Sequence, residues 1–522
     1  MLPPLIVALI LAGACALNAI HVGFPVYWHP DEVTKALQLQ TGDYNFYHPQ
    51  LLLRLAMILH GVLPLDNSIR DIVLAGRFVS VGATAIATAA FAIFVIRRFG
   101  IVFGIVTAVL LALTPTVFLN AHFFKEDATL LMGMALVMLA IQSVESRPGP
   151  LNIALLGAAV GLAASAKYVG IIMVVPAIAM LASKRVRRID SVRFLFCATI
   201  VFAGINSAGI FGSASLKEGF LKEVIHVMTD HDGISWGPRS ARTLINFWQS
   251  TPAAVIVIWI AGMMLYVWQT LDNFRREPAT KSPSAMMDGI VLFTPLLLLA
   301  TAQLSMVAIA RYVLPATVLT TIAAVWITAS VFSSVRNRAL RILPIGLLAI
   351  GAVATVGSFQ TALHVFTDDP RGRLGSWIAT HLPADAKIAA EFYAGLPTAE
   401  SQAIDRTLPA LPQAVEMPFY HLGMAGSPGK LRELGYTHMV LSSGNFDRFL
   451  DPTARLASGA AIERKRFYQE VFATLTPIHD EPRLTYVDPA LNMQLLVYDI
   501  RKQADAGQQK PAPSAKAEAP AN

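Results

Sequence analysis

Charged residues are scarce in this chain of 522 residues. Asp, Glu, Lys and Arg make up 14% of it, whereas a soluble globular chain carries about 25%. Apolar residues make up 55%, and the mean hydropathy is +0.54. This composition excludes an intrinsically disordered protein and argues strongly against a soluble enzyme.

Cysteines and nucleotide-binding fingerprints are also scarce or missing. The two cysteines, Cys15 and Cys197, lie in apolar runs. They are therefore predicted to be buried thiols, not a disulfide or part of a metal site. Neither a GxxxxGK[ST] loop nor a GxGxxG turn occurs between a strand and a helix, which disfavours a nucleotide-driven pump.

Long apolar runs, by contrast, are abundant. Because about 20 apolar residues cross a bilayer as a helix, the sequence predicts a polytopic α-helical membrane protein with eleven transmembrane helices. The predicted spans are 4–21, 72–96, 101–119, 128–144, 151–166, 167–183, 194–212, 252–270, 289–309, 312–332 and 342–360.

The net charge of +7 comes mainly from short basic loops, such as 97–98 and 184–188, on one side of this arrangement. The positive-inside rule makes that side, and the N-terminus, cytoplasmic. The basicity therefore indicates topology and not a nucleic-acid partner. One choice stays open. The run 151–183 forms either a hairpin with Lys167 and Tyr168 at its outer tip, or one long tilted helix that would invert the later topology.

Three parts follow along the chain. Residues 1–364 form the transmembrane domain, with long outer loops 22–71 and 213–251. Residues 365–502 have soluble composition and predict a C-terminal extracytoplasmic α/β domain, and residues 503–522 a disordered tail. Helix-like and strand-like patterns alternate there in segments such as Trp377–His381, Ala386–Ala390, Lys430–Gly435, Met439–Ser442 and Leu495–Ile500.

Acidic residues gather in two of the outer turns. Asp31 and Glu32 follow the first span, and Lys125, Glu126 and Asp127 lie between two later spans. Such acids either stabilise helix N-termini through the helix dipole or act as bases on a substrate hydroxyl. Both interpretations stay open on the sequence alone.

Two isolated cations, Lys167 and Arg311, are expected on the same outer side. Each either extends to the membrane interface along its aliphatic stem or binds a phosphate. A lipid-linked phosphate would lie at this depth, where carboxylates can deprotonate an acceptor and cations can stabilise a leaving phosphate.

The order of several motifs carries a resemblance over roughly residues 1–335. These motifs are Trp28–Glu32, Tyr47–Leu51, Arg77–Ser80, Thr114–Pro115, Glu126–Asp127, Gly161–Ala163, Lys167–Tyr168 and Arg311–Pro315. Together they resemble the polyprenyl-phosphate-dependent glycosyltransferases of the GT-C fold, above all the protein O-mannosyltransferase and lipid A aminoarabinose transferase groups. The outer α/β segment resembles the soluble C-terminal domains of bacterial members.

The resemblance implies an enzyme that transfers a hexosyl or pentosyl group, with inversion, from a polyprenyl-phosphate donor. The acceptor would be a hydroxyl of a protein, lipid or glycan at the outer face of the bacterial cytoplasmic membrane. Asp31 would be the catalytic base, and Glu32 would orient the base or the acceptor. Asp127 matches the second acidic position, with Glu126 as its stand-in.

Substrate-binding roles are implied for four further residues. His48 would line the sugar or acceptor pocket, while Lys167, with Tyr168, and Arg311 would bind the lipid phosphate. The chain departs from the pattern at Gln50, where relatives commonly carry a second proline.

A divalent metal is a further possibility raised by the resemblance, with Asp31, Asp127 and a nearby histidine as ligands. The string 230–232 (Asp-His-Asp) is a second metal-like feature, and a solvated loop is its alternative. The sequence establishes no cofactor.

Two other functions compete with glycosyl transfer. A lipid or polyisoprenoid transporter or flippase places ionisable or helix-breaking residues near the midplane of the membrane, whereas the predicted spans here are nearly free of charge. A non-catalytic envelope-assembly protein, whose outer domain binds partners, is the third hypothesis.

Overall fold

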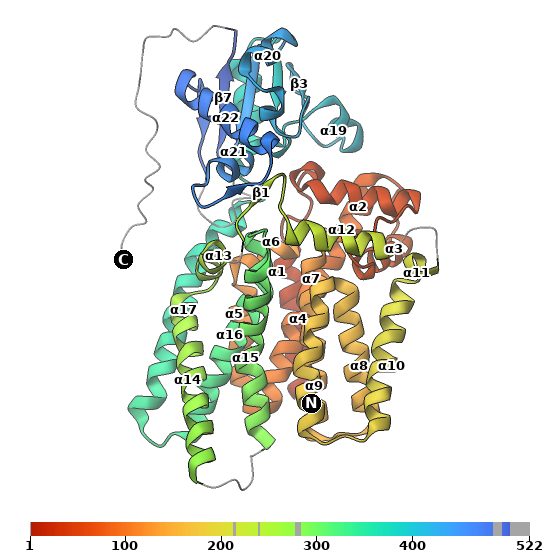
Figure 1. Ribbon diagram of the computed structural model, residues 1–522, viewed down its shortest axis with the longest axis vertical. Helices are drawn as coiled ribbons and strands as arrows, with labels where there is room; N and C mark the ends of the chain where they lie inside the picture. The colour runs from red at the N-terminus through yellow and green to blue at the C-terminus, as the bar shows by residue number, and fades with distance from the viewer. Residues whose placement is uncertain (1, 212–215, 238–240, 277–282, 484–492, 502–522) are drawn as a thin grey trace. The chain divides into compact units, whose positions relative to one another are not determined.

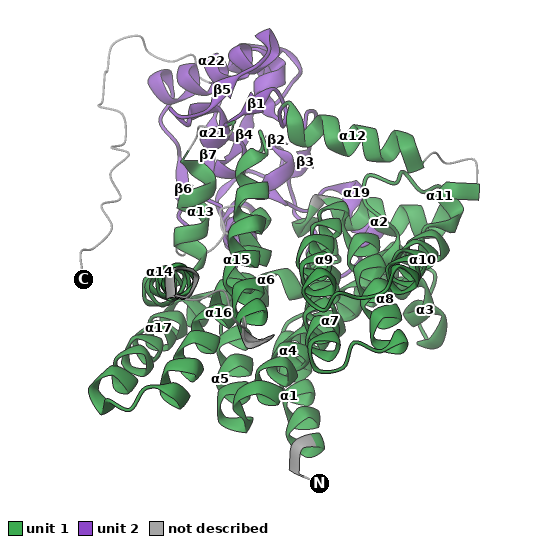
Figure 2. Cartoon of the chain, turned by 60° about the horizontal axis from the view of Figure 1, so that its bottom comes forward, with its two compact units in different colours: residues 1–229, 237–367 green, residues 230–236, 368–522 purple. Residues whose placement is uncertain are grey.

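The computed structural model describes residues 2–211, 216–237, 241–276, 283–483 and 493–501. The predicted tail, 503–522, lies outside the described residues. The chain divides into two compact units (Figure 2): residues 1–229 with 237–367, and residues 230–236 with 368–522. The boundary predicted from the sequence, at residue 365, lies close to that at 367–368. The segment 230–236, predicted as part of an outer loop of the first domain, belongs instead to the second unit.

The first unit is helical (Figure 1). Its longer helices are α1 (Leu2–Asn18), α4 (Ile69–Phe99), α5 (Ile101–Ala112), α7 (Glu126–Ser146), α8 (Pro150–Ala166), α9 (Val174–Ser183), α10 (Arg188–Ile205), α14 (Ala253–Arg276), α15 (Pro283–Leu304), α16 (Leu314–Ser334) and α17 (Arg338–His364). The shorter helices are η1 (Val26–Trp28), α2 (Pro30–Thr41), α3 (Leu51–Val62), α6 (Pro115–Ala121), η2 (Tyr168–Met173), α11 (Ser207–Phe211), α12 (Leu216–Met228), α13 (Arg242–Ser250) and η3 (Ala310–Val313). In Figure 1, α2 and α12 run across the direction of the long helices.

Several of these helices can cross a membrane, in agreement with a membrane protein. Among the described residues six are long and apolar enough: Ile69–Phe99, Glu126–Ser146, Ala253–Asp272, Ala285–Leu304, Ala310–Ser334 and Arg338–His364. The pair α5 and α6 makes a seventh if it counts as one span. The remaining predicted spans fall on α1, α8, on η2 with α9, and on α10, which are shorter or more charged. Eleven crossings therefore stay a prediction.

Two features of the sequence break these helices. The pair α5 and α6 bends by 66° at Thr114–Pro115, because a proline cannot continue the backbone hydrogen bonding of a helix. Helix α8 ends at Lys167, whose backbone is extended (φ −154°, ψ 140°). The chain then folds back so closely that a Cβ atom on Gly170 would lie 2.1 Å from the Ala163 carbonyl oxygen. The run 151–183 is therefore a hairpin, and the alternative of one long helix is wrong.

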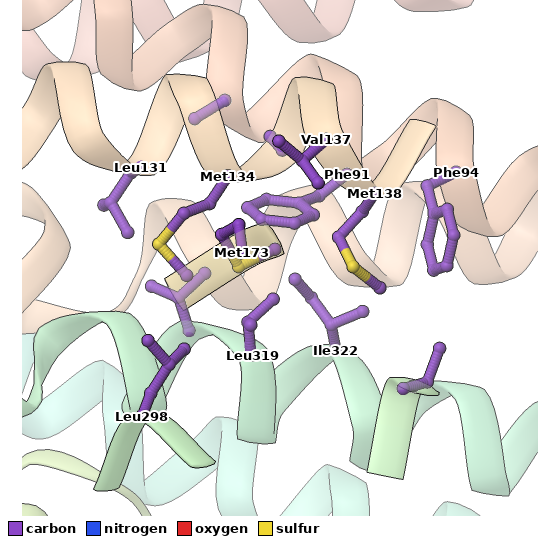
Figure 3. Close-up of a cluster of buried hydrophobic side chains, with 14 of the residues drawn as sticks. Phe91, Phe94, Leu131, Met134, Val137, Met138, Met173, Leu298, Leu319 and Ile322 are labelled. Carbon is purple, nitrogen blue, oxygen red and sulfur yellow. The ribbon is translucent and has the colours of Figure 1, made fainter. Parts of the chain in front are cut away.

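The interior of the first unit is apolar and rich in methionine. Figure 3 shows Met134 and Met138 of α7 beside Phe91 of α4, facing Leu319 and Ile322 of α16. These side chains are 2% exposed or less. The flexible thioether of methionine fills irregular gaps between helices.

The two cysteines differ from their prediction. Cys15 and Cys197 are free thiols, as expected, but both are half-buried and not fully buried. They lie on α1 and α10, which carry many exposed apolar side chains. An apolar run on an outer helix of a membrane protein does not imply burial inside the protein, because lipid can cover it.

The second unit is an α/β fold. Its five-stranded sheet has the order β3-β2-β4-β7-β6. Strands β3, β2 and β4 are parallel to one another, and β7 is antiparallel to both of its neighbours, β4 and β6. A short antiparallel pair, β1 with β5, lies apart from it. The elements are β1 (Ile234–Ser235), α18 (Pro370–His381), β2 (Lys387–Ala390), η4 (Phe392–Ala394), α19 (Ala399–Ile404), β3 (Ala414–Glu416), η5 (Leu422–Ala425), α20 (Pro428–Glu433), β4 (His438–Ser442), α21 (Ser443–Leu450), β5 (Arg455–Leu456), α22 (Gly459–Thr474), β6 (His479–Glu481) and β7 (Leu495–Asp499). The five segments named in the sequence as helix-like or strand-like fall on α18, β2, α20, β4 and β7.

Helices α8 and α10 pack through glycines spaced four residues apart. A Cβ atom on Gly157 would lie 2.2 Å from the Phe194 carbonyl oxygen, and one on Gly161 would lie 2.4 Å from that of Ala198. Small residues at this spacing allow two helix backbones to approach closely in a membrane.

The first prediction concerns this packing. We expect Gly161→Ala to force α8 away from α10 and to destabilise the protein by about 1–3 kcal/mol. The measurement is the thermal unfolding midpoint in detergent. Gly204→Ala is the matched control, since a Cβ atom on this α10 glycine meets nothing within 4 Å. Equal midpoints for Gly161→Ala and Gly204→Ala would contradict the prediction.

Candidate active site

Helix α2 begins at the N-cap residue His29, whose Nδ1 accepts a hydrogen bond of 3.2 Å from the backbone N–H of Asp31. Asp31 and Glu32 therefore lie in the first turn of α2, where the helix dipole stabilises carboxylates. Glu126 and Asp127 occupy the same place in α7. Asp31 and Glu32 are thus the acidic helix start that the sequence offers as one interpretation, which leaves room for a second role. Glu126 and Asp127 also start a helix, but both are buried, so they are not simply solvated groups that cap a helix end.

Glu32 forms a fully buried ion pair with Arg77 of α4. Arg77 donates from Nε to Oε1 (2.9 Å) and from Nη2 to Oε2 (2.7 Å), and neither side chain is exposed. The Phe124 backbone N–H also donates to Oε1 (2.8 Å). Arg77 Nη1 donates to the carbonyl oxygens of Val22 (2.9 Å) and Phe24 (2.6 Å). The pair thus connects α4, the first loop, α2 and the turn before α7.

Asp31 points to a different partner, Lys125, with which it forms an ion pair. The Asp31 side chain is 42% exposed, whereas the side chain of Lys125 is 3% exposed. Burial acts to raise the pKa of Asp31, but the positive charges around it, that of Lys125 first, together outweigh burial and hold this pKa well below its usual range. Asp31 is thus an ionised carboxylate that a substrate can reach.

The other two acids are buried in ion pairs of their own. Glu126 Oε1 lies 2.8 Å from Lys35 Nζ, and Asp127 Oδ1 lies 2.9 Å from Lys167 Nζ. The carboxylate side chains are only 4% and 2% exposed. Of the four acids, Asp31 is therefore the accessible one.

The two predicted cations come together. Lys167 Nζ lies 5.1 Å from the centroid of the Tyr312 ring, next in sequence to Arg311. Burial, and then the charge of Arg311, lower the pKa of Lys125 to about 8, against the attraction of Asp31. Lys125, Lys167 and Arg311 thus form one group of positive charges beside the acids.

The segment 46–50 is fixed across the ends of two helices. Tyr168 donates from its hydroxyl to the Phe46 carbonyl oxygen (2.8 Å), and the Gln50 backbone N–H donates to Asn206 Oδ1 (2.9 Å). Tyr168 therefore holds this segment in place, which is a positioning contact in addition to the binding role predicted for it.

His48 lies on this segment, with Nε2 3.9 Å from Glu126 Oε2. Burial lowers the pKa of His48 to about 4. The imidazole is therefore neutral at pH 7 and does not form an ion pair with Glu126. A neutral imidazole can donate one hydrogen bond and accept another.

Several buried polar atoms of the site have no hydrogen-bond partner among the described residues. They are His48 Nδ1, both carboxamide atoms of Gln50, and Asp127 Oδ2. Each such atom costs about 1–3 kcal/mol when nothing pairs with it, and native proteins leave few of them. Their concentration here indicates a ligand that supplies donors and acceptors, as hydroxyl groups do.

The predicted metal sites are not supported by the side chains. Within the described ranges, no three His, Cys, Asp or Glu residues gather closely enough to hold an ion. Asp31 and Asp127 are each neutralised by an ammonium group, which a cation would have to displace. In the second unit, Asp232 contacts His421 (3.3 Å) and His231 (3.6 Å).

Sequence reasoning missed several residues of this site. Lys35 could have been found, because it lies one helical turn after Asp31 and therefore on the same face. The pairing of Arg77 with Glu32 spans 45 residues along the chain, and no local pattern indicates it. In the sequence, Gln50 stands out only as a departure from the family pattern.

The sequence also matches a family of known proteins. Residues 68–209 match the family model described as dolichyl-phosphate-mannose-protein mannosyltransferase. The resemblance predicted from the sequence is thereby confirmed for this segment. It contains Glu126, Asp127, Lys167 and Tyr168, but not Asp31.

Comparison with solved structures gives weaker similarities. ArnT from Cupriavidus metallidurans bound to undecaprenyl phosphate is 14% identical, with 94% of this chain and 97% of that chain covered and a TM-score of 0.48. The Archaeoglobus fulgidus oligosaccharyltransferase is 11% identical, with 90% and 73% covered and a TM-score of 0.46. The S. cerevisiae protein O-mannosyltransferase Pmt1-Pmt2 complex is 17% identical, with 44% and 35% covered and a TM-score of 0.31. No curated protein matches the chain.

The second prediction concerns the buried pair. Arg77→Met leaves the Glu32 carboxylate buried without a counter-charge, and we expect a loss of about 3–5 kcal/mol in unfolding free energy. The double variant Arg77→Met/Glu32→Met removes both charges and should recover part of this loss. Denaturant unfolding in detergent measures both. Strictly additive effects of the two substitutions would contradict the proposed coupling.

Proposed function

We propose that this protein transfers a sugar from a polyprenyl-phosphate donor to an acceptor hydroxyl, with inversion at the anomeric carbon. The observation that carries the proposal is the position of Asp31, an ionised and accessible carboxylate beside a group of three cations. The family match supports a lipid-phosphate sugar as the donor. The acceptor would be a protein, lipid or glycan.

Asp31 would act as the general base. It takes the proton of the acceptor hydroxyl while the acceptor oxygen forms a bond to the anomeric carbon. The bond between that carbon and the phosphate oxygen breaks, and its electron pair leaves with the polyprenyl phosphate. Because the acceptor attacks from the face opposite the leaving phosphate, the configuration inverts.

The cations would stabilise the charge that develops on the leaving phosphate. Lys167 and Arg311 are the proposed phosphate-binding residues, and Lys125 adds a third positive charge next to the base. Arg311 brings a planar guanidinium that suits a phosphate. These groups lie at or near helix ends and not near the middle of a span (Arg311 is the second residue of the span Ala310–Ser334), which favours chemistry at the membrane surface over a lipid transporter.

The unpaired polar atoms would bind the sugar. A hydroxyl group both donates and accepts, so it can satisfy the Gln50 carboxamide, His48 Nδ1 and Asp127 Oδ2. Tyr168 would hold the segment that carries His48 and Gln50, and Glu126, which lies near His48, would line the same pocket. Glu32, whose two oxygens are both bound, would position Asp31 without touching the substrate.

The proposed setting is the outer face of the bacterial cytoplasmic membrane. The N-terminus would be cytoplasmic and the second unit extracytoplasmic, as the distribution of basic loops predicts. A label on the C-terminus that is detected inside the cell would contradict this topology.

The third prediction tests the base. Asp31→Asn should lower sugar transfer by about 10²–10⁴-fold, since the amide cannot take the proton. The unfolding midpoint is measured alongside, because the substitution also removes the counter-charge of the buried Lys125, and the variant must remain folded at the assay temperature. The purified protein is incubated with a panel of polyprenyl-phosphate sugars, and the released polyprenyl phosphate is measured. Asp43→Asn, an exposed acid after α2, is the matched control. Full activity in Asp31→Asn rules out the base. No transfer by the unmodified protein with any donor favours a transporter or an assembly protein.

The fourth prediction concerns pH. Lys125 is charged below its pKa of about 8 and loses its charge as the pH rises through this value. We therefore expect kcat/KM to fall between pH 7 and pH 9, because the leaving phosphate loses a nearby positive charge. The pKa of Asp31 lies well below its usual range, so this carboxylate stays ionised at pH 5. We therefore expect no fall of kcat/KM between pH 7 and pH 5. In Lys125→Arg the alkaline fall should disappear, and its persistence would assign it to another group.

A further inference from the structure

A second cluster of polar side chains lies within the second unit. The parallel strands β3, β2 and β4 lie in the order second, first, third along the chain. The chain continues from β2 to β3 on one side of the sheet, and from β4 to β6 and β7 on the other side. The direction of the connections therefore changes between the neighbouring strands β2 and β4. Ligands of open α/β sheets bind at this switch point, outside the carboxyl ends of the strands.

The carboxyl ends of these strands are joined by the buried Glu391, which directly follows β2. Its carboxylate accepts hydrogen bonds from the Ser442 N–H (2.8 Å), the Leu422 N–H (3.2 Å) and the Tyr468 hydroxyl (2.5 Å). Ser442 ends β4, and Leu422 follows the loop after β3. The edge of the sheet is therefore a fixed surface and not a set of independent loops.

Each strand end contributes a polar or aromatic side chain to this surface. Tyr393 follows β2, and its hydroxyl accepts from Arg448 Nη2 (3.1 Å). Asn445 and Arg448 lie on one face of α21, directly after β4. The Asn445 side chain donates to the carbonyl oxygen of Tyr420 (3.3 Å), in the loop after β3.

The segment 230–236 adds an acid to the cluster. Asp232 Oδ2 lies 3.3 Å from Nε2 of His421, whose ring packs edge-on against Tyr420 with centroids 4.7 Å apart. The Asp-His-Asp string noted in the sequence therefore contributes to this surface.

Three buried polar atoms of the cluster have no hydrogen-bond partner within the described part of the chain. They are His421 Nδ1, Asn445 Oδ1 and Arg448 Nη1. His421 and Asn445 are 1% and 0% exposed. Three such atoms at one sheet edge call for a ligand that pairs with them, since leaving them unpaired is costly.

The chemistry of the surface favours an uncharged, hydroxyl-rich ligand. Tyr420 is 36% exposed, and its ring stacks on Phe392 with centroids 5.0 Å apart, so a partly exposed aromatic residue lies next to the unpaired atoms. Asp232 and Arg448 offset each other's charge, which disfavours a phosphate or carboxylate ligand. A sugar ring combines an apolar C–H face with hydroxyls that pair with guanidinium, imidazole and amide groups.

We propose that the second unit holds a carbohydrate-binding site at the carboxyl ends of β3, β2 and β4. Tyr420 stacks on a sugar ring, and Arg448, His421 and Asn445 bind its hydroxyl groups. This site goes beyond the proposed sugar transfer, because it lies in the second unit and includes none of the residues that we assign to the transfer.

The test is calorimetric titration of the full-length protein in detergent. The probes are maltotriose, mannotriose and galactotriose as neutral oligosaccharides, with inorganic phosphate as the anionic probe. We expect saturable binding of at least one oligosaccharide and at least tenfold weaker binding in Tyr420→Ala and in Arg448→Gln. Tyr436→Ala, a half-buried tyrosine of the same unit that takes no part in the cluster, should bind normally.

Tyr420→Phe keeps the aromatic face and should retain binding, which separates stacking from misfolding. Asp31→Asn should lose sugar transfer and keep oligosaccharide binding, so a failure of either proposal is visible by itself. The carbohydrate site is overturned if none of the three oligosaccharides binds. It is also overturned if affinity is unchanged in both Tyr420→Ala and Arg448→Gln, or if phosphate binds and displaces the oligosaccharide.

Discussion

The part of the first unit that carries the acidic residues is held in place by one buried guanidinium. Arg77 lies on α4, and its nitrogens are bound by the Glu32 carboxylate and by backbone carbonyls of the first loop. Its guanidinium also lies 3.5 Å from the centroid of the Phe24 ring. A buried charge is tolerated only when nearly all its hydrogen-bonding capacity is used. This requirement fixes the start of α2 against α4, and with it the position of Asp31.

The same constraint separates the roles of two adjacent acids. Asp31 and Glu32 are neighbours in the first turn of one helix, so their side chains leave it in different directions. Glu32 points to Arg77 and is wholly buried, while Asp31 points to Lys125 and stays accessible. Because Glu32 is held rigidly, the direction in which the Asp31 side chain leaves the helix is fixed as well. The sequence motif alone does not say which of the two acids is buried and which is exposed.

The sequence predicts the features that depend on local pattern. The apolar runs and the named segments of the α/β unit follow from hydrophobic periodicity. The hairpin at Lys167 is favoured by Arg147 and Lys184, since basic residues on both sides of 151–183 require an even number of crossings, and the structure decides between it and one long helix. The acidic pairs at the starts of α2 and α7 follow from the preference of carboxylates for helix N-termini. What the sequence cannot give is the choice of partner. Glu126 pairs with Lys35 and Asp127 with Lys167 across gaps that no periodicity spans, and segment 230–236 joins the second unit only through its tertiary contacts.

The pairing of every acid with a base also bears on how such a site can work. Three cations placed together would repel one another in a membrane protein unless carboxylates offset them. The positive charges are therefore already balanced within the protein by Asp31, Glu126 and Asp127. Asp31 is the one of these acids that water reaches. For it to act as the proposed base, its hold on Lys125 would have to loosen, and the negative charge of the proposed donor's phosphate would take over part of the balance of Lys125 at that moment.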